Sequence, residues 1–239
     1  MTNPDYIHSL SSLTAARAER ALEQGELSSS SRLYRVSKRT IDIVGGLVAL
    51  MLATPFLLCA AVAIAATSSG PVFFRQERIG YRGRTFRIWK LRTMYTNRDD
   101  SAHRAYVRSM FTEDRSLEPR RTGLHKLDDD RVTPVGRLLR RASIDELPQL
   151  FNVLRGEMSL VGPRPALAWE VELFGPLEQL RCQVKPGITG LWQVSGRSRL
   201  TMREALELDC VYAHKPSVLM DLKILLKTIP VVFARRDAA

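Results

Sequence analysis

Apolar and polar residues are distributed unevenly along the chain, and the most extreme feature is an apolar segment at residues 41–67. Asp42, at the edge of this segment, is its only charged residue. A straight helix rises ~1.5 Å per residue, so a helix of this length exceeds the ~30 Å hydrocarbon core of a bilayer. A buried core helix usually keeps a polar stripe, whereas this segment is apolar all round. The pattern therefore predicts a helix long enough to span a membrane.

Two features of this segment leave its topology open. Pro55 removes a backbone donor and clashes with the preceding turn, which predicts a bend near residues 53–55. Basic residues flank the segment on both sides, whereas a single span should carry an excess on one side. They are Arg32, Arg35, Lys38 and Arg39 before it, and Arg75, Arg78 and Arg82 after it. A bent span and a re-entrant helix that leaves by the face it entered fit this pattern equally well.

Shorter elements are predicted on either side of the apolar segment. Residues 1–31 contain few large apolar side chains and end in a serine run, so we expect a mobile extension there. Residues 72–74 and 86–91 are rich in β-branched and aromatic residues. Gly80 and Gly83 separate these two runs, which predicts a β-hairpin.

The remainder of the chain is predicted to be mostly helical. Residues 95–130 are polar, and we expect helix and loop in them. Residues 134–143 form an amphipathic pattern with arginines off the apolar face, typical of a solvated basic helix or of a helix lying on anionic headgroups. From residue 166 onward we expect helix, with a loop at residues 185–197. Charges and a proline interrupt residues 217–233, so this last helix is expected to pack on the core or on the membrane surface.

Charge and cysteine content narrow the class of protein. The 239 residues include 36 Lys plus Arg against 25 Asp plus Glu, a net charge of +11. This balance favours an anionic partner: nucleic acid, an acidic membrane face or a phosphorylated substrate. Cys59, Cys182 and Cys210 lack metal-binding spacing and are odd in number, which favours a reducing compartment over a disulfide framework or a zinc site. The polar N-terminus lacks the pattern of a secretory signal.

Candidate chemistry lies in residues 143–165, SIDELPQLFNVLRGEMSLVGPRP. Apolar residues recur here with helical spacing, and Gly156 can end the helix. Asp145 and Glu146 therefore fall in or just before the first helical turn. Ser143 and Glu146 match a capping box, so the two acids can simply cap the helix. Alternatively, Asp145 is a nucleophile towards phosphorus, and the adjacent Glu146 is a hard ligand for Mg²⁺.

Four motifs in this chain resemble one known family. They are KRTID at residues 38–42, SSGPVFFRQERIGYRGRTFRIWKLRTM at 68–94, DELPQLFNVLRGEMSLVGPRP at 145–165 and KPGITGLWQVSGR at 185–197. In this order they resemble the bacterial sugar transferase family, the monotopic phosphoglycosyl transferases, also called polyprenyl-phosphate hexose-1-phosphate transferases. The resemblance covers about residues 38–230, and the short form is similar to exopolysaccharide production enzymes. It implies an α/β, mostly helical fold embedded in one membrane face by a proline-broken re-entrant helix, with a small β-hairpin and interfacial amphipathic helices.

The resemblance also implies a reaction. The enzyme would transfer a sugar 1-phosphate from a UDP-sugar to undecaprenyl phosphate and so initiate exopolysaccharide or other surface glycan synthesis. The family's catalytic dyad falls on Asp145 and Glu146. Asp145 would attack the β-phosphorus, expel UMP and hold the sugar phosphate covalently, while Glu146, with Asp145, would bind Mg²⁺. Ping-pong kinetics would follow from the covalent intermediate. The motifs do not name the sugar.

Several basic residues are candidates for substrate binding. Arg164 and Arg197 match family arginines associated with phosphate or nucleotide, and the prolines beside Arg164 restrict its backbone. Lys90 and Arg92, at the end of a predicted strand, are candidates for the diphosphate. A surface salt bridge is the alternative for each, and for Arg92 it carries equal weight. Arg78 also matches the family and can be structural.

Three further residues match membrane or lipid positions of the family. Lys38 and Arg39 match a basic pair at the membrane interface, which anchors the protein or binds the lipid phosphate. Pro55 matches the break of the re-entrant helix, so the resemblance favours re-entry over a bent span. Asp221 matches an acidic position, and we expect it to pair with Lys223 or with a nearby arginine.

These expectations divide the chain into an extension at residues 1–31, a membrane re-entrant helix at 32–70 and a catalytic domain at 71–239. The catalytic domain would lie on the cytoplasmic face of the bacterial inner membrane. The expected partners are a UDP-sugar, undecaprenyl phosphate and membrane lipid, without nucleic acid. The oligomeric state, a homodimer included, is left open.

Two rival functions remain at this point. A membrane-tethered nucleic-acid-binding protein would explain the charge, but no recognisable nucleic-acid-binding motif is present in the sequence. A noncatalytic scaffold of a polysaccharide assembly complex would need the two acids only as helix caps.

Overall fold

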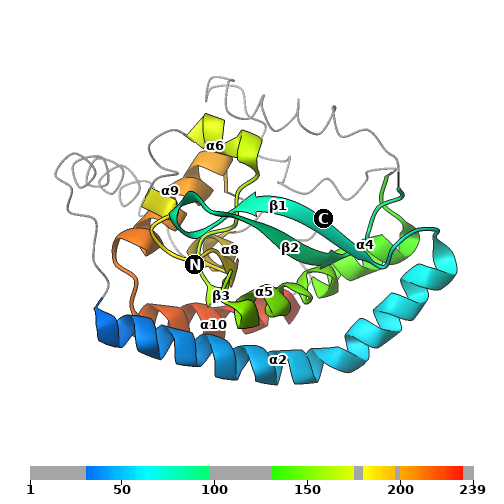
Figure 1. Cartoon of the computed structure of the whole chain (residues 1–239), viewed down its shortest axis with the longest axis horizontal. Coiled ribbons are helices and arrows are strands. Elements are labelled where there is room, and N and C mark those ends of the chain that lie inside the picture. The colour runs from blue at the N-terminus through cyan, green and yellow to red at the C-terminus, as the bar shows by residue number, and fades with distance from the viewer. Residues whose placement is uncertain (1–30, 97–130, 175–179, 197–199, 234–239) are drawn as a thin grey trace.

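The computed structural model describes residues 31–96, 131–174, 180–196 and 200–233. Within these ranges the chain is mostly helical, with two small two-stranded sheets. Figure 1 shows a hairpin and the shorter helices gathered along one long helix, α2. All but the last residue of the predicted extension, and most of the polar stretch at 95–130, lie outside the described residues. The division of the chain at residue 70 stays a prediction.

The apolar segment forms most of α2, Arg32–Thr67, which is one continuous helix. Pro55 lies inside it. Thr54, beside the proline, donates its hydroxyl to the carbonyl of Leu50 at 2.8 Å. Figure 1 shows α2 turning away from a straight course in its second half, as expected of a helix that contains a proline.

A large part of the surface of α2 is apolar and uncovered. Side chains that are more than half exposed include Leu47, Met51, Leu52, Phe56 and Val62. Buried small residues such as Gly46, Ala53 and Ala60 line the opposite face. Within the described ranges, α2 is the one helix long and apolar enough to cross a bilayer. An uncovered apolar surface of this extent indicates an apolar neighbour, which agrees with the predicted membrane association.

The predicted β-hairpin is present, and its first strand is longer than expected. Strand β1, Phe73–Ile79, pairs antiparallel with β2, Thr85–Leu91. The 3-10 turn η1, Tyr81–Gly83, joins them. Because side chains alternate across a strand, Gln76 and Lys90 lie on the same face of the hairpin. This face carries one of the predicted substrate-binding residues.

The free edge of β2 is covered by one side chain of helix α5, Gln149–Arg155. Asn152, which is fully buried, accepts from the backbone N–H of Trp89 at 3.1 Å and donates to the carbonyl of Arg87 at 2.8 Å. An amide carries both a donor and an acceptor, so it can replace a neighbouring strand at this point. Asn152 therefore fixes the hairpin against α5, a contact that the sequence did not predict.

The two acids lie just before α5, as predicted, but the predicted capping box is not formed. Helix α4, Pro134–Arg141, ends before a separate 3-10 turn, η2, Ile144–Glu146, and α5 begins only after Pro148. Ser143 makes no side-chain capping bond. The predicted capping box is therefore wrong, because Pro148 starts the helix and keeps the acids in the turn before it. Gly156 ends α5 in a left-handed conformation, as predicted.

The second half of the chain contains a sheet that the sequence analysis missed. Strand β3, Ser159–Val161, pairs in parallel with β4, Gly187–Thr189. Strand β4 and helix α8, Leu191–Ser195, occupy the segment predicted as a loop. The other α-helices with bounds in the described part of the chain are α6, Ala168–Phe174, α9, Met202–His214, and α10, Val218–Phe233.

A buried polar cluster ties α2 to α9, α10 and β3. Lys38 in α2 lies 3.1 Å from Asp221 in α10 and donates to the carbonyl of Val161 at 2.8 Å. Tyr212 donates to the same carboxylate at 2.7 Å. The expected pairing of Asp221 with Lys223 or an arginine is therefore wrong. Its cation comes from α2, far away in the sequence, where local spacing gives no signal.

Candidate active site

The turn that carries the two acids is fixed by its backbone. Ser143 is left-handed, with φ 55°, and Ile144–Glu146 form the 3-10 turn η2. Pro148 then sets the entry into α5. Asp145 is only 8% exposed, whereas the side chain of Glu146 keeps 37% of its exposure. One acid is thus buried and its neighbour reaches solvent.

Lys90 from the hairpin meets this turn directly. Its Nζ lies 2.9 Å from Oε1 of Glu146. The lysine side chain is 19% exposed, so solvent screens this ion pair less than a pair on the open surface. The structure thus brings Lys90 and both acids into one site. Its binding of a diphosphate stays a prediction.

The electrostatic surroundings of Asp145 are unusual for an aspartate. Burial and then the charge of Glu146 raise the pKa of Asp145 to about 6, while Lys90 and Arg140 oppose this rise. At neutral pH the carboxylate is therefore mostly ionised, although it is poorly solvated. A charged group held in this way is typical of catalytic nucleophiles and bases.

Arg140 is a site residue that the sequence placed only in a basic helix. Its Nε donates to the hydroxyl of Thr93 at 2.9 Å, and its charge lowers the pKa of Asp145. Helical periodicity put the arginines of α4 off the apolar face, and it contained no signal of the contact with Thr93. Arg140 thus adds a second cation beside Asp145.

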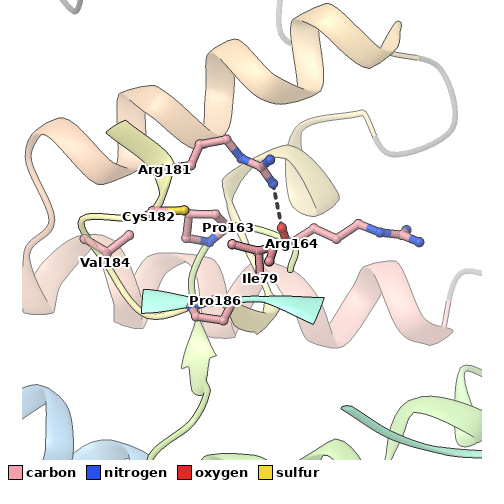
Figure 2. Close-up of a pocket in the computed structure, with 8 residues that line it drawn as sticks. Ile79, Pro163, Arg164, Arg181, Cys182, Val184 and Pro186 are labelled. Carbon is pink, nitrogen blue, oxygen red and sulfur yellow. Dashed lines mark hydrogen bonds between the residues drawn. The ribbon is translucent and has the colours of Figure 1, made fainter. Parts of the chain in front are cut away.

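Arg164 follows β3 on a tightly held backbone. Five carbonyls from residues 161–166 accept hydrogen bonds: Val161 from Lys38 and Tyr212, Pro163 from the N–H of Gly187, Arg164 from Arg181, Pro165 from Arg78, and Ala166 from the N–H of Ile79. Figure 2 shows Arg181 reaching this backbone while the side chain of Arg164 extends away from the pocket. Among the described residues, the Arg164 guanidinium has no hydrogen-bond or ion-pair partner. The rigid backbone of this segment therefore presents the guanidinium group of Arg164 with its donors unpaired among the described residues.

Arg78 links this segment to the acids. It is 7% exposed and donates to the carbonyl of Pro165 at 3.1 Å. Burial and the neighbouring Arg164 lower the pKa of Arg78 to about 10, whereas Glu170 and Glu146 raise it. Arg78 therefore interacts electrostatically with both Arg164 and Glu146. The segment that carries Arg164 and the turn that carries the two acids thus lie near the same buried arginine.

The other predicted basic residues lie elsewhere. Arg92 donates to the carbonyls of Ser69 at 2.6 Å and Ser68 at 2.8 Å, beyond the end of α2. Arg92 is only 5% exposed, so it does not form the surface salt bridge that was the alternative. Its role in diphosphate binding stays a prediction. Arg39 donates to the last carbonyls of α5, and Lys38 joins the buried cluster with Asp221. Arg197 lies outside the described residues.

Asp145 and Glu146 offer carboxylate oxygens, the kind of ligand that Mg²⁺ prefers. Within the described residues, no group of three His, Cys, Asp or Glu side chains forms a closed metal cage. Mg²⁺ is usually held by one or two carboxylates together with substrate phosphates and water. Asp145 and Glu146 supply two adjacent carboxylates that interact electrostatically. The residues present therefore fit a Mg²⁺ ion that is shared with a bound phosphate.

Comparisons with known proteins point to one family. Residues 33–235 match the sequence profile of the bacterial sugar transferases. The chain is 39% identical over 203 residues to an exopolysaccharide production protein ExoY of Sinorhizobium fredii, covering 85% of this chain and 88% of that protein. It is 42% identical over 209 residues to a UDP-glucose:undecaprenyl-phosphate glucose-1-phosphate transferase of Caulobacter vibrioides, covering 84% and 71%. It is 37% identical over 215 residues to an undecaprenyl-phosphate galactose phosphotransferase of Salmonella typhimurium, covering 88% of this chain but 43% of that longer protein.

Proposed function

Because this chain belongs to the bacterial sugar transferase family and is a transferase, as its motifs predicted, we propose that it transfers a sugar 1-phosphate from a UDP-sugar to undecaprenyl phosphate. The products would be UMP and an undecaprenyl diphosphate sugar, the first intermediate of a surface glycan. The names of two similar proteins describe transfer of glucose 1-phosphate or galactose phosphate to undecaprenyl phosphate, which supports this reaction. The observation that carries the proposal is the buried Asp145 beside Glu146 and Lys90.

In the first half-reaction, a carboxylate oxygen of Asp145 attacks the β-phosphorus of the UDP-sugar. The bond from this phosphorus to the bridging oxygen breaks, and UMP leaves with that oxygen. The sugar phosphate stays on Asp145 as an acyl phosphate. In the second half-reaction, a phosphate oxygen of undecaprenyl phosphate attacks the same phosphorus and releases the Asp145 carboxylate. Splitting one displacement into two steps is the usual result of nucleophilic catalysis.

The surrounding cations have separate tasks in this proposal. Lys90 and Arg140 stabilise the ionised form of Asp145, since both lower its pKa. Arg164 presents a guanidinium fork that suits bidentate binding of a phosphate group. Bound Mg²⁺, held by Glu146 and Asp145, would neutralise negative charge on the diphosphate. Because Asp145 is mostly buried, water has limited access to the acyl phosphate.

The donor and the reaction class are tested together by UMP release. Purified protein is incubated with undecaprenyl phosphate, Mg²⁺ and one UDP-sugar at a time from a panel of glucose, galactose and N-acetylated sugars. We expect release of UMP with at least one donor. If a well-folded protein releases no UMP from any UDP-sugar of the panel, the proposal is contradicted and the noncatalytic scaffold is favoured.

We also propose that α2 is re-entrant and places the catalytic residues on the cytoplasmic face of the inner membrane. Its bend, its basic flanks and its uncovered apolar surface support this topology. Single cysteines introduced at Ser31 and Ser69, in a variant without native cysteines, should both react with an impermeant reagent from the cytoplasmic side only. Labelling of the two sites from opposite sides would show that α2 spans the bilayer.

A further inference from the structure

Two buried charged side chains hold the backbone of Arg164 from both sides. Asp209 of α9 accepts a hydrogen bond from the N–H of Arg164 at 3.3 Å. Arg181, in the segment before β4, donates to the carbonyl of Arg164 at 2.5 Å. The same Nη2 of Arg181 lies 2.9 Å from the same Oδ2 of Asp209. The two side chains therefore form a clamp around one residue, closed by their own ion pair, and we call it the Arg181–Asp209 clamp.

The local sequence explains why side chains are needed to hold this backbone. Arg164 lies between Pro163 and Pro165, and proline has no backbone N–H. The N–H of Arg164 is therefore the only backbone donor of residues 163–165, and Asp209 accepts from it. The carbonyls of both prolines also accept hydrogen bonds. Because the peptide groups on both sides of the Arg164 Cα are held, the direction of its Cα–Cβ bond is fixed.

The clamp contacts the backbone of Arg164 and leaves its guanidinium accessible. Figure 2 shows Arg181 reaching the carbonyl of Arg164, while the side chain of Arg164 extends away from this contact. Arg181 and Asp209 are buried, with 5% and 2% exposure, whereas Arg164 is partly exposed. A soluble ligand can therefore reach the guanidinium of Arg164 without touching the clamp.

A buried ion pair is poorly suited to stabilising a fold. The cost of removing two charges from water can exceed their mutual attraction, so apolar side chains of similar volume often give equal or greater stability. Charged groups do, however, form stronger and more directional hydrogen bonds than neutral ones. Arg181 and Asp209 each direct such a bond at the backbone of Arg164. The clamp thus contributes orientation of Arg164 more than stability.

The guanidinium of Arg164 is also held near a second cation. The charge of Arg164 lowers the pKa of Arg78, so the two guanidinium groups repel each other. On a flexible backbone, Arg164 would move away from Arg78 into solvent. The fixed backbone limits this movement and keeps the guanidinium of Arg164 close to the site.

We propose that Arg181 and Asp209 are positioning residues, which aim the guanidinium of Arg164 at a phosphate group of the nucleotide donor. This inference rests on the proposed function for the identity of that phosphate. It adds two residues that touch no substrate and act through Arg164. Their loss should therefore weaken phosphate binding only while the Arg164 side chain is present.

The clamp is tested by a double-mutant cycle in the full-length protein. Binding of UDP in the presence of Mg²⁺ is measured by isothermal titration calorimetry. Asp209→Asn breaks the ion pair, and Arg181→Met combined with Asp209→Leu replaces both charges by apolar side chains, in case the single variant does not fold. Each variant is made in the wild type and in Arg164→Ala. Glu207→Gln is the matched control, because it makes the same change of acid to amide at a buried position of the same helix.

We expect Asp209→Asn to weaken UDP binding roughly tenfold in the wild-type background, the loss expected for one misdirected hydrogen bond to a charged group. In the Arg164→Ala background the same substitution should change the affinity by less than roughly twofold, because no guanidinium is left to aim. The apolar double variant should show the same dependence on Arg164. It should unfold at a higher temperature than Asp209→Asn, which leaves Arg181 without its charged partner. Glu207→Gln should leave UDP binding unchanged in both backgrounds.

Three results would overturn the proposal. Unchanged UDP affinity in both clamp variants would show that Arg164 is oriented without Arg181 and Asp209. An equal loss of affinity with and without the Arg164 side chain would show a general effect on the fold. A wild type that does not bind UDP would leave Arg164 without a phosphate to bind. By contrast, the expected dependence on Arg164 in a protein that releases no UMP from any donor would support this inference and contradict the proposed function.

Discussion

Asp145→Asn is expected to abolish sugar phosphate transfer and to stabilise the fold at the same time. The amide cannot act as a nucleophile towards phosphorus, so UMP release should fall by at least roughly a thousandfold, as for the loss of nucleophiles in other enzymes. The gain in stability arises because a buried carboxylate is costly to ionise. A residue that merely caps a helix would leave the stability nearly unchanged in this substitution, since Asn caps a helix about as well as Asp.

The stability gain should depend on pH in a defined direction. Burial and the charge of Glu146 raise the folded-state pKa of Asp145 from its ordinary value of 3.8 to about 6. The folded state therefore holds this proton more tightly than the unfolded state, and wild-type stability falls as pH rises from about 4 to about 6. The full cost, on the order of 2–3 kcal/mol, is present above that range. Asp145→Asn should thus equal wild type near pH 4 and exceed it at pH 7.

This prediction is measured by thermal unfolding in a chelating buffer at both pH values, with UMP release as the activity readout. Glu172→Gln is the matched control, because it makes the same change of acid to amide at an exposed position. Its activity and Tm should equal those of the wild type. Retention of more than a hundredth of the activity by Asp145→Asn would rule out Asp145 as the nucleophile.

Arg164→Lys is expected to reduce kcat/KM for the UDP-sugar by roughly ten- to a hundredfold, the effect of losing a charge-assisted bidentate contact. The charge is kept, so the loss would report the planar fork of the guanidinium rather than the local potential. The fold should be unaffected, because the segment is held through its backbone carbonyls and the side chain has no partner among the described residues.

The control for this prediction is Arg84→Lys, the same substitution at an exposed turn position. Kinetics with varied UDP-sugar and saturating undecaprenyl phosphate separate KM from kcat. A larger effect on KM would indicate binding of the donor in its ground state, and an equal fall in kcat and kcat/KM would indicate binding of the transition state. If Arg164→Lys matches Arg84→Lys in both constants, Arg164 has no part in phosphate binding.

The elements that the sequence predicted correctly depend on local patterns. The β-hairpin, helices α4 and α10, the bend of α2 and the end of α5 at Gly156 each follow from residue types within a few positions of each other. The capping box was predicted wrongly although its signal was local. Pro148 outweighed the match of Ser143 and Glu146 to a capping box.

The features that the sequence did not predict depend on contacts between distant segments. Strands β3 and β4 are three residues long and pair in parallel across a long connection that includes α6, so neither gives a period that can be recognised. Asn152 covers the edge of β2, and Lys38 pairs with Asp221, through contacts that no local spacing encodes. The same holds for Arg78 and Arg140, whose inward orientation became apparent only in the fold.

The most direct test of the catalytic account is the intact mass of the protein after incubation with its UDP-sugar donor and Mg²⁺ in the absence of lipid. The account predicts a covalent adduct with the mass of one sugar phosphate, located on Asp145, absent in Asp145→Asn and discharged when undecaprenyl phosphate is added. Turnover that requires both substrates together, with no adduct at any time, would contradict it, because the sugar phosphate would then pass directly from donor to lipid.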